Sequence, residues 1–204
     1  MLKPDSDAPH VCGLGWNEFV KKLEDFHGYA APGALWGGIM VDMARERLKS
    51  LFGPDALFWV LVESYSCLPD AVQLLTPCTV GNRRLQVLDL NRYALTLYTK
   101  PGGQGVRIFV DGGKLGPWPH LQSWFMGLVD KKDQDANLLT NDIRLGGASA
   151  CSMRAVRVPE TYLRRERKGK IGLCPACGEP YPLRDGERCL ACRGGFDLPV
   201  ELKS

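Results

Sequence analysis

The sequence predicts an α+β fold, in which a mixed β-sheet is flanked by helices and followed by a small zinc-binding domain with four cysteine ligands. Three observations predict this class. Apolar residues recur at helical spacing near the start, short apolar runs separated by turn residues follow, and two Cys-x-x-Cys pairs lie near the end. The 204 residues suffice for one ordinary domain and a small appendage. We expect a core domain at 1–158, a basic connector at 159–171 and the zinc-binding domain at 172–204.

Two helices are expected first. One begins at Asn17, a residue type favoured at helix N-caps, and ends at His27. The other begins with a proline at its first position and runs over about 32–51. Gly37-Gly38 weakens this second helix, which predicts the close approach of a neighbouring backbone.

The middle of the chain predicts the sheet. Residues 57–62 are a continuous apolar run, too short for a full helix and typical of a strand buried on both faces. The segment 89–92 separates two alternating segments and indicates a hairpin, because Asn91 tolerates the left-handed conformation. The other expected elements are helices near 69–76 and 120–129, strands near 85–87, 95–97, 106–110 and 152–158, and a polar loop at 131–137.

Four cysteines near the C-terminus form the strongest chemical signal. Cys174 and Cys177 make one Cys-x-x-Cys turn, and Cys189 and Cys192 make a second after a gap of eleven residues. Each turn directs two thiolates at one point, so the two turns predict a closed, tetrahedral, structural zinc site. Iron in the same geometry and a disulfide framework are the alternatives. The gap predicts a small hairpin around Asp185.

Composition narrows the classes of partner. The 26 basic and 23 acidic residues give a net charge of +3, too balanced for a chain that binds nucleic acid over its whole surface. No apolar run approaches the roughly 20 residues that cross a bilayer, and the N-terminus lacks the apolar stretch of a secretory signal. We therefore expect a cytoplasmic protein with reduced thiols and no membrane contact.

The connector concentrates basic residues, namely Arg164, Arg165, Arg167, Lys168 and Lys170. A solvated linker helix over 160–168 is one interpretation, and contact with a phosphate backbone or an acidic partner is the other. The zinc domain is too small to build its own core, so metal binding should supply most of its folding free energy. A closed zinc site is structural, so we expect this domain to dock to a protein or hold a dimer together rather than bind nucleic acid.

Three residues of the core suggest a second site. His27 lies at the break between the first two helices, Cys67 lies just beyond the buried strand, and Cys78 follows the next helix. The dipole of a helix stabilises a thiolate at its N-terminus, which suits Cys67 as a nucleophile or a metal ligand. From the residues alone, a capping histidine and cysteines that fill the core are the simpler interpretation.

The segments around these three residues resemble the FmdE-like family, which is associated with formylmethanofuran dehydrogenase. The family pattern reads Phe-His-Gly-His-x-Cys-Pro-Gly, then Glu-x-x-Ser-Cys-x-x-Asp-Ala-x-Gln, then Thr-Gly-Cys-Thr-x-Gly. The similarity covers about residues 17–110, and the matching residues are Phe26, His27, Gly28, Pro32, Gly33, Glu63, Ser66, Cys67, Asp70, Ala71, Gln73, Thr76, Cys78, Thr79 and Gly81. Some members also end in a four-cysteine zinc module, as this chain does.

The resemblance implies a thioredoxin-like core with a five-stranded mixed sheet, a homodimer, and a cleft lined by His27, Cys67 and Cys78 that can hold a second divalent metal. Tyr29 and Ala31 stand where the family often has a second His and a Cys, and neither is a good ligand for a soft metal. A core metal would therefore bind more weakly, or leave positions open for water or substrate. Nothing in the sequence suggests a pterin–metal cofactor or an iron–sulfur chain, so we do not expect this chain alone to catalyse the formylmethanofuran reaction.

Two functions stay open. In the first, the chain is an accessory metal- or ligand-binding protein that uses His27 and Cys67 in its core cleft and docks to a partner through its zinc domain. In the second, the core is an enzyme acting on a small substrate, with Glu63 or Asp70 as proton carrier beside a metal, or with Cys67 as a thiolate nucleophile. The homodimer is expected to use an aromatic surface around Trp118, Trp124 and Phe125.

Overall fold

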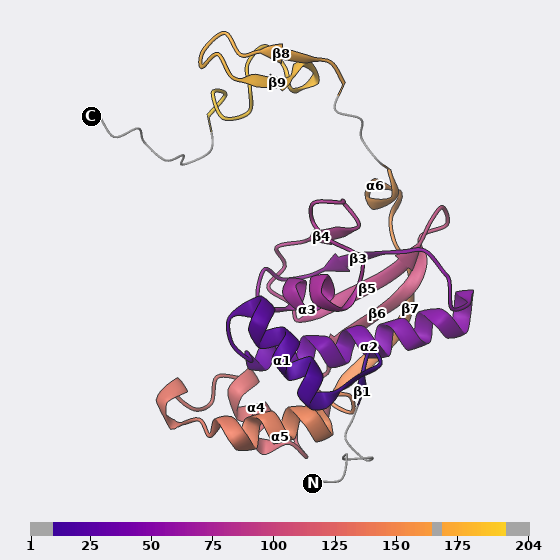
Figure 1. The fold of residues 1–204 in the computed structure, drawn as a ribbon, viewed down its shortest axis with the longest axis vertical. Coiled ribbons are helices and arrows are strands. Elements are labelled where there is room, and N and C mark those ends of the chain that lie inside the picture. The colour runs from indigo at the N-terminus through magenta and orange to yellow at the C-terminus, as the bar shows by residue number, and fades with distance from the viewer. Residues whose placement is uncertain (1–9, 165–168, 195–204) are drawn as a thin grey trace. The chain divides into compact units, whose positions relative to one another are not determined.

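The computed structural model describes residues 10–164 and 169–194, and the chain divides into two units, Met1–Leu163 and Arg164–Ser204. The first unit is built on a five-stranded sheet with the order β4-β3-β5-β6-β7 (Figure 1). Its strands are β3 (Phe58–Val62), β4 (Leu85–Val87), β5 (Ala94–Thr99), β6 (Gln104–Val110) and β7 (Cys151–Arg157). β3 and β4 are parallel and the other pairs are antiparallel, which confirms the predicted mixed sheet and α+β class.

Three helices precede or interrupt the sheet: α1 (Trp16–His27), α2 (Pro32–Phe52) and α3 (Leu68–Leu75). α2 packs on β5 and β6, α3 packs on β4, and α1 lies on α2 and α3 (Figure 1). The core fills the space between these helices and the sheet. The strand residues that contribute to it alternate along the chain and are fully or almost fully buried: Val60, Val62, Leu95, Leu97, Val106 and Ile108.

The glycine pair in α2 has a different cause from the one predicted. A Cβ atom on Gly38 would overlap the ring of Phe19, a fully buried residue of α1. The glycine therefore admits an aromatic side chain, and the neighbour that approaches α2 here is a ring rather than a backbone.

The predicted hairpin at 89–92 is wrong. β4 and β5 lie on opposite sides of β3, so the two segments that flank the turn are not neighbours in the sheet. The turn does use Asn91 at a positive φ of 51°, as the residue type suggested.

The segment between β6 and β7 forms α4 (Pro119–Phe125) and α5 (Ala136–Gly146). The predicted helix near 120–129 corresponds to α4 and is shorter than expected. α5 was not predicted, and its first residues fall in the expected polar loop. The remaining elements of this unit are β1 (His10–Val11), β2 (Leu14–Gly15), η1 (Gly112–Lys114), η2 (Lys131–Asp133) and α6 (Glu160–Leu163). In the part of the chain that the structure describes, no helix is long and apolar enough to cross a membrane.

The second unit contains β8 (Ile171–Leu173), β9 (Pro180–Pro182) and η3 (Leu183–Asp185). β8 and β9 form an antiparallel hairpin whose loop contains the first cysteine pair. The hairpin predicted around Asp185 is therefore replaced by a single helical turn. Residues 165–168 of the expected connector helix and 195–204 of the expected zinc domain lie outside the described residues.

Candidate functional site

The four cysteines of the second unit meet at one point. The sulfur atoms of Cys174, Cys177, Cys189 and Cys192 all lie within 4.8 Å of one another, and those of Cys177 and Cys189 are 3.8 Å apart. In a tetrahedral centre with Zn–S bonds of about 2.3 Å, the sulfurs are about 3.8 Å apart, so the donor set fits zinc.

Backbone amides point at these sulfurs and prepare them for a cation. The amide of Cys189 donates to the sulfur of Cys174 at 3.5 Å, and the amide of Cys192 donates to that of Cys189 at 3.4 Å. Hydrogen bonds from the amides of Cys189 and Cys177 lower the pKa of Cys174 to about 6. Hydrogen bonding to the sulfurs of Cys189 and Cys177 raises the pKa of Cys192 to about 12. Four crowded thiols therefore cannot all ionise unless a divalent cation binds them.

In the core unit, His27 and Asp70 form a hydrogen-bonded pair. His27 is the last residue of α1 and Asp70 lies in the first turn of α3, and His27 Nδ1 is 2.6 Å from Asp70 Oδ2. The His27 side chain is 16% exposed, so one edge of the ring reaches solvent. A carboxylate on Nδ1 fixes the imidazole in the tautomer whose Nε2 carries the free lone pair, which is the arrangement of many metal-binding histidines.

Cys67 lies beside this pair, at the N-terminus of α3. It is the residue before the first turn of α3, and a Cβ atom on Gly33 would be 3.3 Å from its sulfur. Burial raises the pKa of the Cys67 thiol, and the amides of Cys67 and Ala34 oppose this effect. The hydroxyl of Tyr93 donates to the carbonyl of Gly33, so this side of the thiol is closed by a tyrosine that the sequence did not indicate.

Cys78 is not brought to the same place. α3 has eight residues, so its two ends lie about 12 Å apart. Cys67 lies before the first end and Cys78 beyond the second, where its thiol is fully buried and donates to the carbonyl of Phe58 at 3.4 Å. Cys78 is therefore placed as a core residue, and the predicted grouping of His27, Cys67 and Cys78 is reduced to the first two.

Glu63, a candidate proton carrier, is held by two arginines. Arg107 donates two hydrogen bonds to its carboxylate, at 2.6 and 2.8 Å, and Arg92 lies 2.9 Å away. Burial raises the pKa of Glu63, but the hydrogen bonds and charges of Arg107 and Arg92 outweigh burial and leave the pKa below its ordinary value. A carboxylate with this environment stays ionised and is poorly suited to carry a proton. Neither arginine was predicted, because both lie far from Glu63 in the sequence.

Among the residues that the structure describes, only the four cysteines form a group of three or more His, Cys, Asp or Glu side chains close enough to share an ion. His27, Asp70 and Cys67 converge on the first turn of α3 without forming such a group. The core position thus offers two ligand types, an imidazole oriented by a carboxylate and a half-buried thiol.

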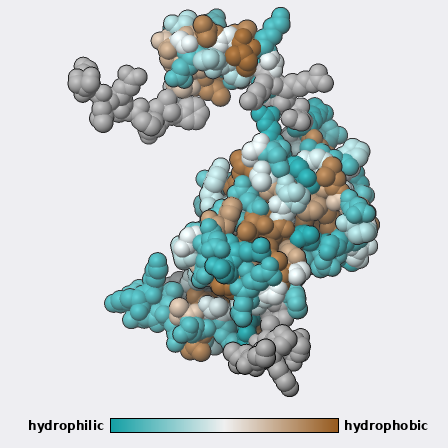
Figure 2. Space-filling model, viewed as in Figure 1, coloured by the Kyte–Doolittle hydropathy of each residue, from teal (hydrophilic) through white to brown (hydrophobic). Residues whose placement is uncertain are grey.

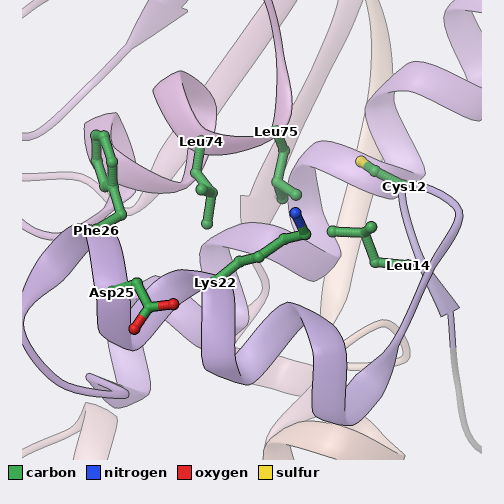
Figure 3. A pocket seen from close by; sticks show the side chains of 7 residues that line it. All are labelled: Cys12, Leu14, Lys22, Asp25, Phe26, Leu74 and Leu75. Atoms are coloured by element: carbon green, nitrogen blue, oxygen red, sulfur yellow. The ribbon is translucent and has the colours of Figure 1, made fainter.

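A groove continues from this position along α1 and α3 (Figure 3). It has a volume of about 480 Å³, and Phe26 and Leu74 in its lining follow the His27–Asp70 pair by position on the two helices. Figure 2 shows hydrophobic surface gathered near α3, beside the hydrophilic surface of α1. The remaining lining residues come from α1, α3 and the β1–β2 turn: Cys12, Leu14, Lys22, Asp25 and Leu75.

Comparison with known proteins identifies relatives of both units. The family model described as FmdE, molybdenum formylmethanofuran dehydrogenase operon, matches residues 26–158, and that of the FmdE treble clef zinc finger matches residues 165–196. The solved structure of an FmdE-like protein of tungsten formylmethanofuran dehydrogenase from Syntrophus aciditrophicus is 43% identical, with a TM-score of 0.85, and the match covers 94% of this chain and 99% of that one.

A second relative shares less of its length. A protein of Archaeoglobus fulgidus described as a probable S-adenosyl-L-methionine-binding protein is 36% identical over 129 residues, which is 54% of this chain and 35% of that protein. The chain therefore spans about a third of the length of that relative.

Proposed function

Because the chain belongs to the FmdE family and ends in the treble clef zinc finger of that family, we propose that it is an accessory metal-binding protein with two unlike sites. The four-cysteine site is structural and holds zinc. The core site binds a second divalent metal through His27 and Cys67 and leaves positions open for a ligand.

One observation carries the proposal for the core: the 2.6 Å hydrogen bond between His27 Nδ1 and Asp70. A carboxylate in this position orients the imidazole and increases its basicity, and such pairs recur behind metal-binding histidines. Asp70 then acts as the residue that positions His27 rather than as a proton carrier. A metal at this site would supply Lewis acidity to a bound ligand, while His27 and Cys67 hold it.

The enzyme alternative has less support from the residues. Burial keeps Cys67 in the thiol form, which is unfavourable for a metal-free nucleophile, and Glu63 is committed to its two arginines. Asp70 is committed to His27.

Metal stoichiometry tests the proposal. Protein purified without added zinc should contain two metal ions per chain, and Cys67→Ser and His27→Ala should each contain one, retained by the zinc finger. Cys78→Ser is the matched control, because this thiol lies at the other end of α3, and it should keep both ions. One ion in the unmodified protein, or two in Cys67→Ser, would contradict a core metal site.

We extend the proposal to two partners. Large apolar side chains follow α4 and are exposed, namely Met126 at 56%, Leu128 at 65% and Val129 at 37%. A run of this kind favours a protein interface, and a second copy of the chain is the partner proposed for it. The zinc finger, whose closed site leaves no position for catalysis, is proposed to dock to a protein. Free thiolates in the zinc finger favour a reducing compartment such as the cytoplasm.

A further inference from the structure

The groove between α1 and α3 has the size and lining of a small-ligand site. Its volume of about 480 Å³ falls in the range of roughly 300–1,000 Å³ that is common for such sites. Its walls are largely apolar, with Leu74 and Leu75 on α3, Phe26 on α1, and Leu14 beside the β1–β2 turn (Figure 3). Phe26 is 50% exposed, so an apolar ligand would remove a large hydrophobic ring from water.

Lys22 gives the groove its polarity. Its stem lies along the apolar wall, and its ammonium group points into the groove toward Leu75 and Leu14 (Figure 3). The pair that Lys22 forms with Glu18 is 4.0 Å long, and the two side chains are 50% and 57% exposed. Pairs of this length and exposure are weak, so the ammonium group can turn to an anion in the groove.

The acidic side chains near the groove are engaged elsewhere. Asp25, at the rim, pairs with Lys21 at 3.5 Å, and Asp42 accepts the amide hydrogen of Cys12 at 2.7 Å. Arg45 donates to the carbonyl of Leu75 at 3.1 Å, which compensates the negative end of α3. The arginine also adds a second positive charge behind the groove, so the local field favours a ligand with one negative group.

We propose that this groove binds a small amphipathic carboxylate, whose aliphatic or aromatic body lies against Leu74, Leu75 and Phe26 and whose carboxylate pairs with Lys22. The site is independent of the zinc finger and of any metal at His27. Cys12 contributes a neutral contact. It has a φ of 53° in the tight β1–β2 turn, and burial raises the pKa of its thiol to about 11, so it remains protonated.

Calorimetric titration of the full, zinc-loaded chain with sodium octanoate tests the proposal, with 1-octanol as the uncharged analogue. We expect saturable binding of one octanoate per chain. Leu74→Glu should weaken octanoate binding by about tenfold or more, since it removes apolar wall and adds a like charge. Lys22→Met, which keeps the length of the stem, should weaken octanoate by about tenfold and leave octanol within about twofold.

The matched control is Lys21→Met, which removes a charge from the neighbouring residue of α1 without altering the lining. It should bind octanoate as the unmodified chain does. Octanoate should also protect Cys12 from N-ethylmaleimide, as read by mass spectrometry of the labelled peptide. Absence of saturable binding, equal losses in Lys21→Met and Lys22→Met, or equal losses of octanol and octanoate in Lys22→Met would each overturn the proposal. Loss of the core metal in Cys67→Ser with octanoate binding intact would separate this site from the proposed metal site.

Discussion

Glu63 is the buried charge on which the sheet depends most. Its side chain is 8% exposed, and the two arginines that hold it come from β6 and from the segment before β5. The pairing therefore links three stretches of chain that are adjacent in space but distant in sequence. Removing one partner of a buried, hydrogen-bonded pair leaves an uncompensated charge, which is far more costly than losing an exposed pair.

Glu63→Gln should lower the free energy of unfolding by about 3 kcal/mol at pH 7. The pKa of Glu63 in the folded chain lies below its ordinary value of 4.5, so the carboxylate stabilises the fold above that pH. This contribution is lost as the pH falls through the folded-state pKa. Urea unfolding at pH 7 and at successively lower pH should thus show the gap between Glu63→Gln and the unmodified chain narrowing below about pH 4.5. A gap that stayed constant with pH would contradict this role.

Gly38 provides a test of packing at a single position. Gly38→Ala should destabilise the core unit by about 2 kcal/mol, because the added methyl group overlaps the buried ring of Phe19. In an exposed helix the same change would be stabilising. Gly116→Ala is the control, since a Cβ there meets nothing within 4 Å. Thermal unfolding should separate the two variants, and equal midpoints would be inconsistent with the packing described.

At the scale of elements, α4 depends on a side chain from α5. The carboxylate of Asp142 accepts hydrogen bonds from the amides of His120 and Leu121, at 2.9 and 3.2 Å, so it caps the N-terminus of α4 from outside. α5 is capped locally, by Asp135 with the amides of Asn137 and Leu138. The two helices therefore form in a defined order of dependence, with α5 supporting α4.

Asp142→Ala should cost about 2 kcal/mol, since it leaves two amides near the buried Leu121 without an acceptor. Asp135→Ala, which removes a local and more exposed cap, should cost about 1 kcal/mol. Hydrogen exchange read by mass spectrometry should show faster exchange in α4 for Asp142→Ala and in α5 for Asp135→Ala. The reverse pattern would show that the caps do not act as described.

The sequence was informative about elements with a local cause. α1 and α2 follow from helical periodicity and a proline at the first position, and β3 from its length and apolar composition. The pairing of β3 between β4 and β5 depends on long-range contacts, so the turn at 89–92 could be predicted and its partners could not. α5 was missed because its N-cap lies inside a polar stretch that resembles a loop.

The same distinction applies to the core site. His27 and Cys67 were identified by family resemblance, and the structure adds what local patterns could not supply. Asp70 is 43 residues from His27, and Tyr93 is 60 residues from Gly33. Cys78 fits the family pattern equally well, yet the length of α3 separates it from the other two. Spacing along the chain identified the zinc-finger cysteines because all four ligands lie in two short turns.

At the scale of the whole molecule, the two units differ in what stabilises them. The core unit has a large apolar interior, whereas the described part of the second unit has one small buried cluster of Cys174, Tyr181 and Cys189. Two of these three residues are proposed metal ligands. The fold of the second unit therefore depends on the ion far more than the fold of the first.

Chelation of zinc should unfold the second unit alone. Hydrogen exchange should rise in β8 and β9 after addition of a strong chelator, while β3, β5 and β6 remain protected. Restoring zinc should reverse the change. Simultaneous loss of protection in both units would contradict their independence.

Association of two copies is tested by charge. If the exposed side chains after α4 form the proposed dimer interface, the double change Met126→Asp and Leu128→Asp should shift the mass measured by light scattering from dimer to monomer. Leu51→Asp is the control, since Leu51 is 44% exposed on α2, away from this run in the sequence. A dimer that survives the double change would exclude this surface as the interface.

The position of β7 limits how copies can associate. β7 is the last strand of the sheet, so its outer backbone groups are unpaired within the sheet and could template the addition of another strand. Arg154 and Arg157 are exposed along it, and two such edges aligned antiparallel would bring like charges together. This arrangement protects the protein against open-ended growth through its sheet, and it leaves self-recognition to surfaces made of side chains.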